Sequence, residues 1–159
     1  MNRLLLTIAL ALGATLTAAA LGDTVRPLAD PDPFVRKTLR VRVTNVHLAA
    51  GTIWVGVYES ADDFLDREKA LLVPVRVTAL GDAYVDIPNL IVGEDYALGI
   101  FHDLDDNGEF DTNWLGLPAE PWAFSGRLAS RLRLPRFEEV SFVFKGEKTV
   151  PPLRLRTWL

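Results

Sequence analysis

Apolar and polar residues alternate along most of this chain with the two-residue period of a β-strand, and the 3.6-residue period of a helix is rare. The alternation is clearest at 39–43 and 53–57, where every second residue is Leu, Ile or Val. A turn at 49–51 separates these segments, which predicts that they pair as a hairpin. Further short strands are predicted at 72–78, 83–87, 96–101, 138–144 and 150–156.

A single helix is predicted over residues 61–70. Ser60 stands in the N-cap position, and two aspartates follow in the first turn, where carboxylates suit the positive end of the helix dipole. Arg67 and Lys69 stand near the other end, where cations are favoured.

About seven short strands separated by turn signals predict an all-β fold. We expect an antiparallel β-sandwich of the immunoglobulin or transthyretin type, with one short helix and one long acidic loop. The strand at 72–78 contains Pro74, which has no backbone N–H to donate, and it is therefore placed at a sheet edge. The side chains expected to face the core are Val41, Val43, Val55, Val57, Ile100, Phe142 and Leu155.

Residues 1–20 have the three parts of a secretory signal peptide, namely Arg3, an apolar stretch at 4–16 and the small residues Ala18-Ala19-Ala20. We expect cleavage after the last of these. A membrane anchor is the alternative, but the apolar run is shorter than the roughly twenty residues that span a bilayer. We therefore expect no stable membrane span after cleavage. Residues 21–36 are rich in proline and predict a tether, which leaves 37–159 as the folded domain.

Composition excludes several classes of protein. The chain has no cysteine, which excludes a disulfide scaffold, a thiolate zinc site and a cysteine nucleophile. Its formal net charge is −4, whereas a nucleic-acid-binding domain normally presents a basic face. We therefore expect no nucleic acid among its partners.

Negative charge is concentrated in the middle of the chain. No Lys or Arg occurs between Arg76 and Arg127, and ten acidic residues occupy this interval. Within it, oxygen-bearing residues fall at positions 1, 3, 5, 7 and 9 of a calcium-binding loop, with Gly108 at position 6 for the sharp turn. The predicted ligands are Asp103, Asp105, Asn107, the carbonyl group of Glu109, and Asp111. Because Ca²⁺ prefers such oxygens, the spacing predicts a calcium site.

The calcium pattern is incomplete. Position 12 is Trp114, where a calcium loop has a bidentate glutamate, so we expect weak affinity. Asn113 or Glu120 could fold back to supply the missing ligand. Two alternatives stay open: a metal-free Asx-turn, in which Asp and Asn side chains cap backbone groups, or magnesium or another ion in place of calcium.

Aromatic and polar residues near the loop form a possible ligand groove. Trp114, Trp122 and Phe124 either cap the end of the core or line such a groove. His102 could act as a general base beside Asp103, although a lone histidine at a strand end is more often a hydrogen-bonded structural residue. The full set of possible groove residues is His102, Trp114, Glu120, Trp122, Phe124 and Ser125.

Longer motifs resemble one bacterial family. They are His102-Asp103, Asp105-x-Asn107-Gly108-x-x-Asp111-Thr112-Asn113, Gly116-Leu117-Pro118-x-Glu120 and Phe124-Ser125. Through them, residues 39–155 resemble the uncharacterised family called domain of unknown function 2141. The resemblance implies an exported bacterial protein, periplasmic or secreted, with a sandwich similar to transthyretin-like or carboxypeptidase-regulatory-like domains. It implies no activity.

Three functions are compatible with these patterns. The first is a non-catalytic binding or interaction module for an unknown small ligand or cell-envelope protein, with a calcium-stiffened loop. The second is a small periplasmic hydrolase that uses His102 and the loop carboxylates. The third is a structural accessory protein that pairs with another chain through an edge strand. We expect no catalytic residues, because no nucleophile, base and orienting group occur together.

Overall fold

The computed structural model describes residues 34–128, 130, 133–146 and 150–158. The fold described below belongs to the compact unit at residues 32–159. The predicted signal peptide at 1–20 and most of the predicted tether at 21–36 lie outside the described residues. Among the described residues, no helix is both long and apolar enough to cross a membrane.

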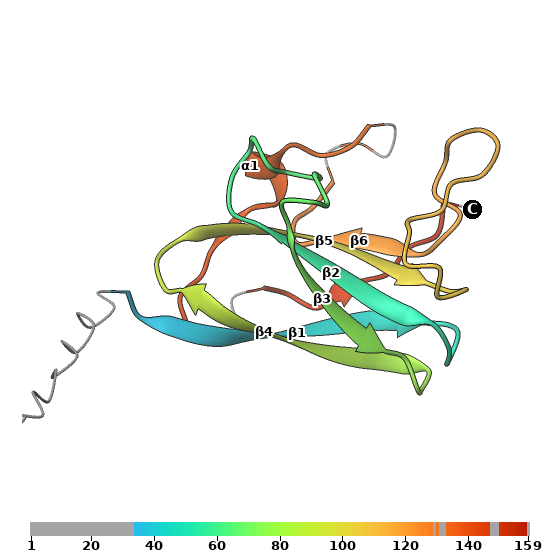
Figure 1. Cartoon of the computed structure of the whole chain (residues 1–159), viewed down its shortest axis with the longest axis horizontal. Helices are drawn as coiled ribbons and strands as arrows, with labels where there is room; N and C mark the ends of the chain where they lie inside the picture. Colours follow the sequence, from blue (N-terminus) through green and yellow to red (C-terminus); the bar gives the residue numbers. More distant parts are fainter. Residues whose placement is uncertain (1–33, 129, 131–132, 147–149, 159) are drawn as a thin grey trace, which may run out of the picture. The chain divides into compact units, whose positions relative to one another are not determined.

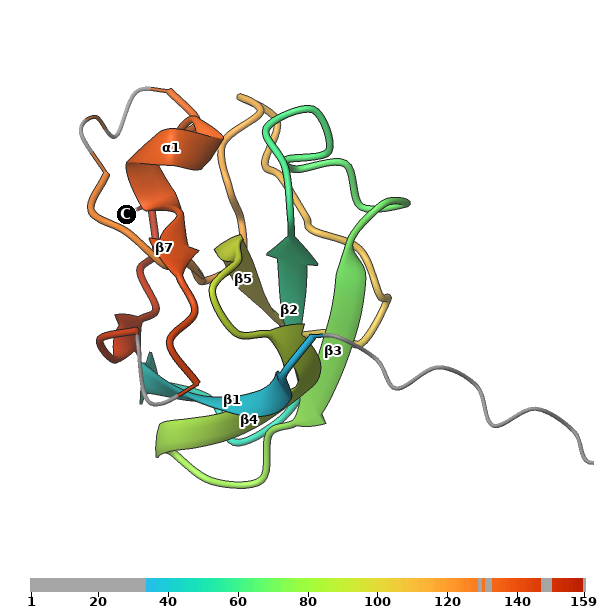
Figure 2. The ribbon, with the colours of Figure 1, turned by 90° about the vertical axis from the view of Figure 1, so that its left-hand side faces the viewer.

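Two β-sheets build the domain, and Figures 1 and 2 show one of them, with β1 and β4, lying across the strands of the other. One sheet has the strand order β4-β1-β8, and the other has the order β3-β2-β5-β6, with β7 pairing with β5. The bounds are β1 Arg36–Val46, β2 Thr52–Tyr58, β3 Leu71–Arg76, β4 Gly81–Ile91, β5 Asp95–Asp103, β6 Trp122–Phe124, α1 Phe137–Val140, β7 Phe142–Val143 and β8 Leu153–Arg154. The prediction of a sandwich-like all-β fold is confirmed.

The predicted hairpin of the first two strands is wrong, because β1 and β2 belong to different sheets. β1 pairs with β4, and the ion pairs Arg40–Asp86 and Arg42–Asp82 join these two strands on their exposed face. Segment 47–51 therefore carries the chain from one layer to the other, and the apolar faces of β1 and β2 meet across the core. The pairing is also not antiparallel throughout, since β1 and β8 run parallel.

The predicted helix at 61–70 is also wrong. This segment forms successive turns, and Leu65 has a φ of 68°, a left-handed conformation that a right-handed helix does not contain. Ser60 still accepts the backbone N–H of Asp63, so the capping signal acts on a turn. The helix of the described residues is α1, which overlaps the first part of the strand predicted at 138–144, so that part of the prediction is wrong.

The core lies between the sheets and is formed by the predicted apolar positions. Of the seven side chains expected to face it, six are buried, and Phe142 is half-buried and packs against the others. Pro74 lies on β3, which is the edge strand of its sheet, as predicted. Alternation also places Trp54, Gly56 and Tyr58 of β2 on the opposite, outer face of this sheet, which matters for the site.

Candidate functional site

Asp103, the last residue of β5, organises the acidic loop. It is only 1% exposed, and one carboxylate oxygen accepts hydrogen bonds from the Trp54 indole N–H at 3.1 Å and the Gly108 amide at 2.8 Å. The other oxygen accepts the Asn107 amide at 3.2 Å. The strand end therefore fixes one carboxylate in the interior, and the following residues wrap around it.

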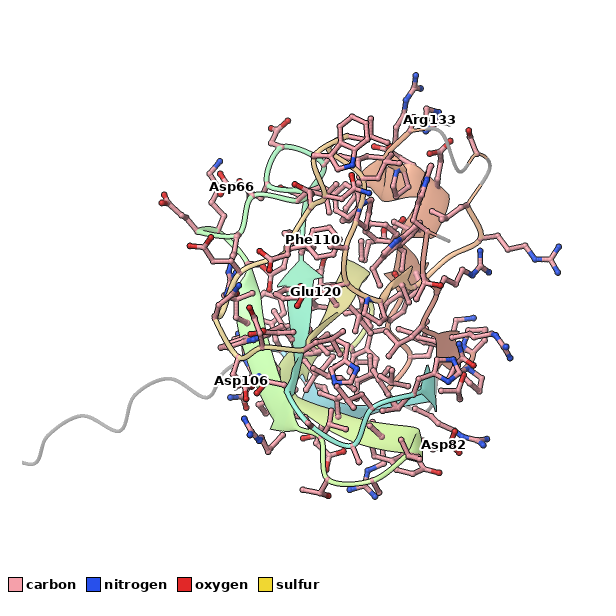
Figure 3. The ribbon with its side chains drawn as sticks, turned by 90° about the vertical axis from the view of Figure 1, so that its right-hand side faces the viewer. Asp66, Asp82, Asp106, Phe110, Glu120 and Arg133 are labelled. Atoms are coloured by element: carbon pink, nitrogen blue, oxygen red, sulfur yellow. The ribbon has the colours of Figure 1, made fainter. Side chains whose placement is uncertain are left out.

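Glu120 returns to the same place from the far end of the loop, just before β6. It is 4% exposed, and its two carboxylate oxygens accept the backbone N–H groups of Leu104 at 2.9 Å and Asp111 at 3.2 Å. Burial raises the pKa of the Glu120 carboxyl group, and the negative charge of Asp103 acts in the same direction, while the two backbone hydrogen bonds oppose the shift. Figure 3 labels Glu120 on this loop, with Phe110 and Asp106.

The loop and strand together assemble a triad of carboxylates. Asp103, Asp105 and Glu120 each offer an oxygen, and these atoms lie within 4.8 Å of one another. Three carboxylates and no nitrogen or sulfur donor are a set suited to a hard cation such as Ca²⁺ or Mg²⁺. The triad therefore could hold a metal ion, with Glu120 in the fold-back position that the sequence left open.

The remaining predicted ligands make hydrogen bonds within the loop. Asn107 spans it, because its side-chain NH₂ donates to Asp105 at 3.3 Å and to Asp111 at 3.1 Å, and its carbonyl accepts the Glu109 amide at 2.6 Å. Asn113 instead caps the amides of a neighbouring turn, so it does not fold back. These are the Asx-type bonds of the metal-free alternative, and they are also compatible with an ion on the triad, so the five-ligand set stays a prediction.

Asp106 has a partner that its neighbours in sequence do not reveal. Its carboxylate accepts the Thr52 hydroxyl at 2.8 Å and pairs with Arg76 at the end of β3. The hydrogen bond from Thr52 lowers the pKa of Asp106, and the guanidinium of Arg76 lowers it further. The loop therefore receives one cation from a distant strand.

His102 and Ser125 are used structurally. His102 is 1% exposed, and its Nε2 lies 2.7 Å from the Ala50 carbonyl oxygen, which ties the turn before β2 to the end of β5. The Ser125 hydroxyl accepts the Leu98 amide at 2.8 Å and donates to the Val140 carbonyl at 2.5 Å. Trp114 is 90% exposed at the tip of the loop. The structure does not bring these three residues together.

A groove of about 530 Å³ lies on the outer face of the five-stranded sheet, and Trp122 and Phe124 are among its lining residues. Its aromatic lining also includes Tyr58 and Phe101, which sequence reasoning missed, although large aromatic residues at polar positions of an alternating strand were a usable signal. Segment 110–118 contributes several further wall residues.

The groove and the acidic loop are continuous. Phe110 belongs to the loop and lines the groove, and its ring centroid lies 5.4 Å from that of Phe101 on β5. A loop held rigidly at Asp103 and Glu120 therefore supplies a defined wall to the groove. Arg133, labelled in Figure 3, lines the groove as well and is bound by Glu139 of α1.

The Arg133–Glu139 ion pair should make the stability of the fold at this wall of the groove depend on pH. Hydrogen bonds from Arg133, and then from the Arg136 amide, lower the pKa of Glu139 from 4.5 to about 2. Because the folded-state pKa is depressed, the pair stabilises the fold fully above pH 4.5 and loses this effect as the pH falls through 2. Glu139→Gln should lower the melting temperature at about pH 6, and the difference from wild type should vanish near pH 2. Glu138→Gln, at an exposed neighbouring position, is the control, and an equal pH dependence there would contradict the assignment.

Comparison with known proteins identifies a family and no more specific relative. The sequence model of a family described as an uncharacterized protein conserved in bacteria, domain of unknown function 2141, matches residues 41–151. Neither the curated proteins nor the solved structures include a significant match. The matched range contains β2 to β7, the second half of β1, the acidic triad and most of the groove. The chain therefore belongs to the bacterial family called domain of unknown function 2141.

Proposed function

We propose that this domain is an exported, non-catalytic binding module in which calcium, held by Asp103, Asp105 and Glu120, fixes one wall of a ligand groove. The observation that carries the proposal is the return of Glu120 to Asp103 across the length of the loop. It supplies the carboxylate that the local calcium pattern lacks at position 12. The expected site of action is the periplasm or the exterior of a bacterium, where free calcium is available.

Electrostatics supports a cation at the triad. Three carboxylates within 4.8 Å repel one another, and two of them are buried, where water screens the repulsion poorly. A divalent cation removes this cost and joins strand β5 to the residue before β6. Calcium suits the loop better than magnesium, because Ca²⁺ accepts irregular coordination, whereas Mg²⁺ demands a tight octahedron and gives up water reluctantly.

A non-catalytic role agrees with the contacts of the candidate catalytic groups. A general base needs a ring nitrogen that reaches a substrate, directly or through water. His102 is buried, and its Nε2 is occupied by the Ala50 carbonyl oxygen. Ser125 is held by backbone groups of β5 and α1 and lacks a basic partner in these contacts.

Calcium should raise the melting temperature of the wild-type domain. With a dissociation constant of about 10⁻⁴–10⁻³ M, typical of extracellular modules, free calcium at about 100 times this value should add roughly 2.7 kcal/mol to the free energy of unfolding. Calorimetry in chelator, in calcium and in magnesium measures the effect, and magnesium should do less. A melting temperature unmoved by millimolar calcium would remove the metal from the proposal.

Charge-matched variants locate the ion. Glu120→Gln and Asp105→Asn each remove one carboxylate of the triad and should abolish the calcium response. Without calcium, each variant loses the hydrogen bonds of the replaced carboxylate but also has less repulsion within the triad. Its free energy of unfolding should therefore fall by no more than the lost hydrogen bonds account for. Glu109→Gln removes the same charge from an exposed side chain of the same loop and should keep the response. In the metal-free Asx-turn, calcium would change none of these proteins, and Asp105→Asn would only destabilise.

A further inference from the structure

Two glycines at the floor of the groove on the outer face of the five-stranded sheet let aromatic rings pack close to the backbone, since a Cβ atom at Gly56 would lie 3.0 Å from the Tyr58 hydroxyl and one at Gly99 would lie 3.4 Å from the Phe124 ring. Gly56 of β2 and Gly99 of β5 are register partners, and both lie on this face. Aromatic rings surround them, among them Tyr58, Phe101 and Phe124. A hollow of about 530 Å³ falls within the range that holds a small organic ligand, and its predominantly apolar lining is typical of such sites.

The charges that line the groove are all positive. Its charged lining residues are Arg67 and Arg133, and no Asp or Glu lines it, although the whole chain has a net charge of −4. Arg133 is neutralised by two hydrogen bonds to the Glu139 carboxylate. Among the described residues, no carboxylate forms an ion pair with Arg67, so this guanidinium is the charge that a ligand meets.

Arg67 is held in position by rings. Its guanidinium carbon lies 5.4 Å from the ring centroid of Trp54 and 5.7 Å from that of Phe101, within the range of a cation–π interaction. Stacking leaves the N–H groups at the rim of the guanidinium plane available to a planar acceptor. A carboxylate matches this fork with two parallel hydrogen bonds.

We propose that the groove binds an apolar organic anion, a small molecule with a hydrocarbon body and one carboxylate. The hydrocarbon body lies against the rings of Tyr58, Phe101 and Phe124 that line the groove, and the carboxylate pairs with Arg67. A carbohydrate does not fit as well, because its many hydroxyl groups need polar partners, and few of the lining side chains are polar. This assignment rests on the proposed function, since it names the ligand class of the same module, but it does not require the cation.

Dodecanoate, used below its micelle concentration, is the probe. Tryptophan fluorescence and calorimetry should show saturable binding of dodecanoate to the domain. Dodecyltrimethylammonium, which has the same chain and the opposite charge, should bind at least tenfold more weakly, and maltose should not bind. Arg67→Gln should weaken dodecanoate binding at least tenfold. Arg67→Lys keeps the charge but loses the guanidinium fork, so it should bind dodecanoate several-fold more weakly than the wild type and still prefer it to dodecyltrimethylammonium. Arg67→Glu should reverse the preference between the two chains.

Arg40→Gln is the matched control, because Arg40 is an exposed arginine on the other sheet, paired with Asp86. It should leave dodecanoate binding unchanged. Circular dichroism of each variant confirms the fold, and Arg67→Lys keeps the test valid if Arg67→Gln is unstable. Absence of saturable binding to the wild type, equal binding of the two charged chains, or tight maltose binding would overturn the assignment.

Parallel titrations in chelator and in calcium separate this assignment from the proposed function. Dodecanoate binding without any calcium effect on melting would support the ligand class and contradict the metal. A calcium shift without dodecanoate binding would support the metal and overturn the ligand class.

Discussion

Gly51→Ala should be among the most destabilising single-methyl additions in this domain, at more than about 4 kcal/mol. A Cβ atom at this position would lie 2.1 Å from the backbone oxygen of Asp103, so the turn and the strand end cannot both keep their places. Moving the turn breaks the contact between Ala50 and His102 and the hydrogen bond from the Val77 amide to Gly51. Urea unfolding of the variant measures the loss.

Gly116→Ala is the control that separates the clash of the added Cβ atom from the cost of placing alanine in a left-handed backbone conformation. Gly51 has a φ of +76° and Gly116 a φ of +74°, but nothing lies within 4 Å of the Cβ position at Gly116. That variant should therefore show only the cost of a left-handed alanine, about 1–2 kcal/mol. Equal losses in the two variants would mean that the turn is free to move and that Asp103 is not fixed by it.

Val55→Asp should prevent the domain from folding. Val55 is 0% exposed in the middle of β2, and its neighbours across the core are apolar. An unpaired carboxylate there costs several kcal/mol in addition to the lost apolar burial, which is comparable with the whole stability of a small domain. Circular dichroism and the elution volume in gel filtration report the outcome.

Tyr84→Asp is the control for Val55→Asp. Tyr84 is more than half exposed on β4, so the same new charge meets water, and the expected cost is about 1 kcal/mol. A soluble, folded Val55→Asp protein would show that the inward face of β2 has been assigned to the wrong set of residues.

The local hydrophobic pattern was sufficient to predict which face of each strand is buried, but it did not show which strands pair. A two-residue period places Val41 and Val55 in the core whatever strand lies beside them. β1 pairs with β4, which begins 45 residues after β1 begins, and no local signal encodes this contact. The helix prediction at 61–70 failed for a related reason, because good end signals flanked a segment with few apolar residues to bury.

The same division holds for the candidate site. Asp103 and Asp105 were predicted because loop ligands recur at short, fixed spacing. Glu120 was only one of two possible fold-back residues, since the path of residues 112–119 decides which one arrives. Arg76 was not predicted as a loop partner, because β3 approaches Asp106 through strand pairing. The groove depends on both the order of the strands and the path of the loop, and of its aromatic lining residues only Trp122 and Phe124 were named from the sequence.

The hydrogen bond between Trp54 and Asp103 gives the domain an internal spectroscopic reporter. The indole proton of Trp54 points at a carboxylate oxygen of the triad, 3.1 Å from its nitrogen, and the guanidinium of Arg67 stacks on the same ring. A change of charge at Asp103 shifts the electron density at the indole N–H through this hydrogen bond. An anion bound by Arg67 shifts the same electron density through the guanidinium that stacks on the ring face. The indole N–H resonance in a proton–nitrogen NMR spectrum therefore reports on both the acidic triad and the ligand groove, with no probe attached to either.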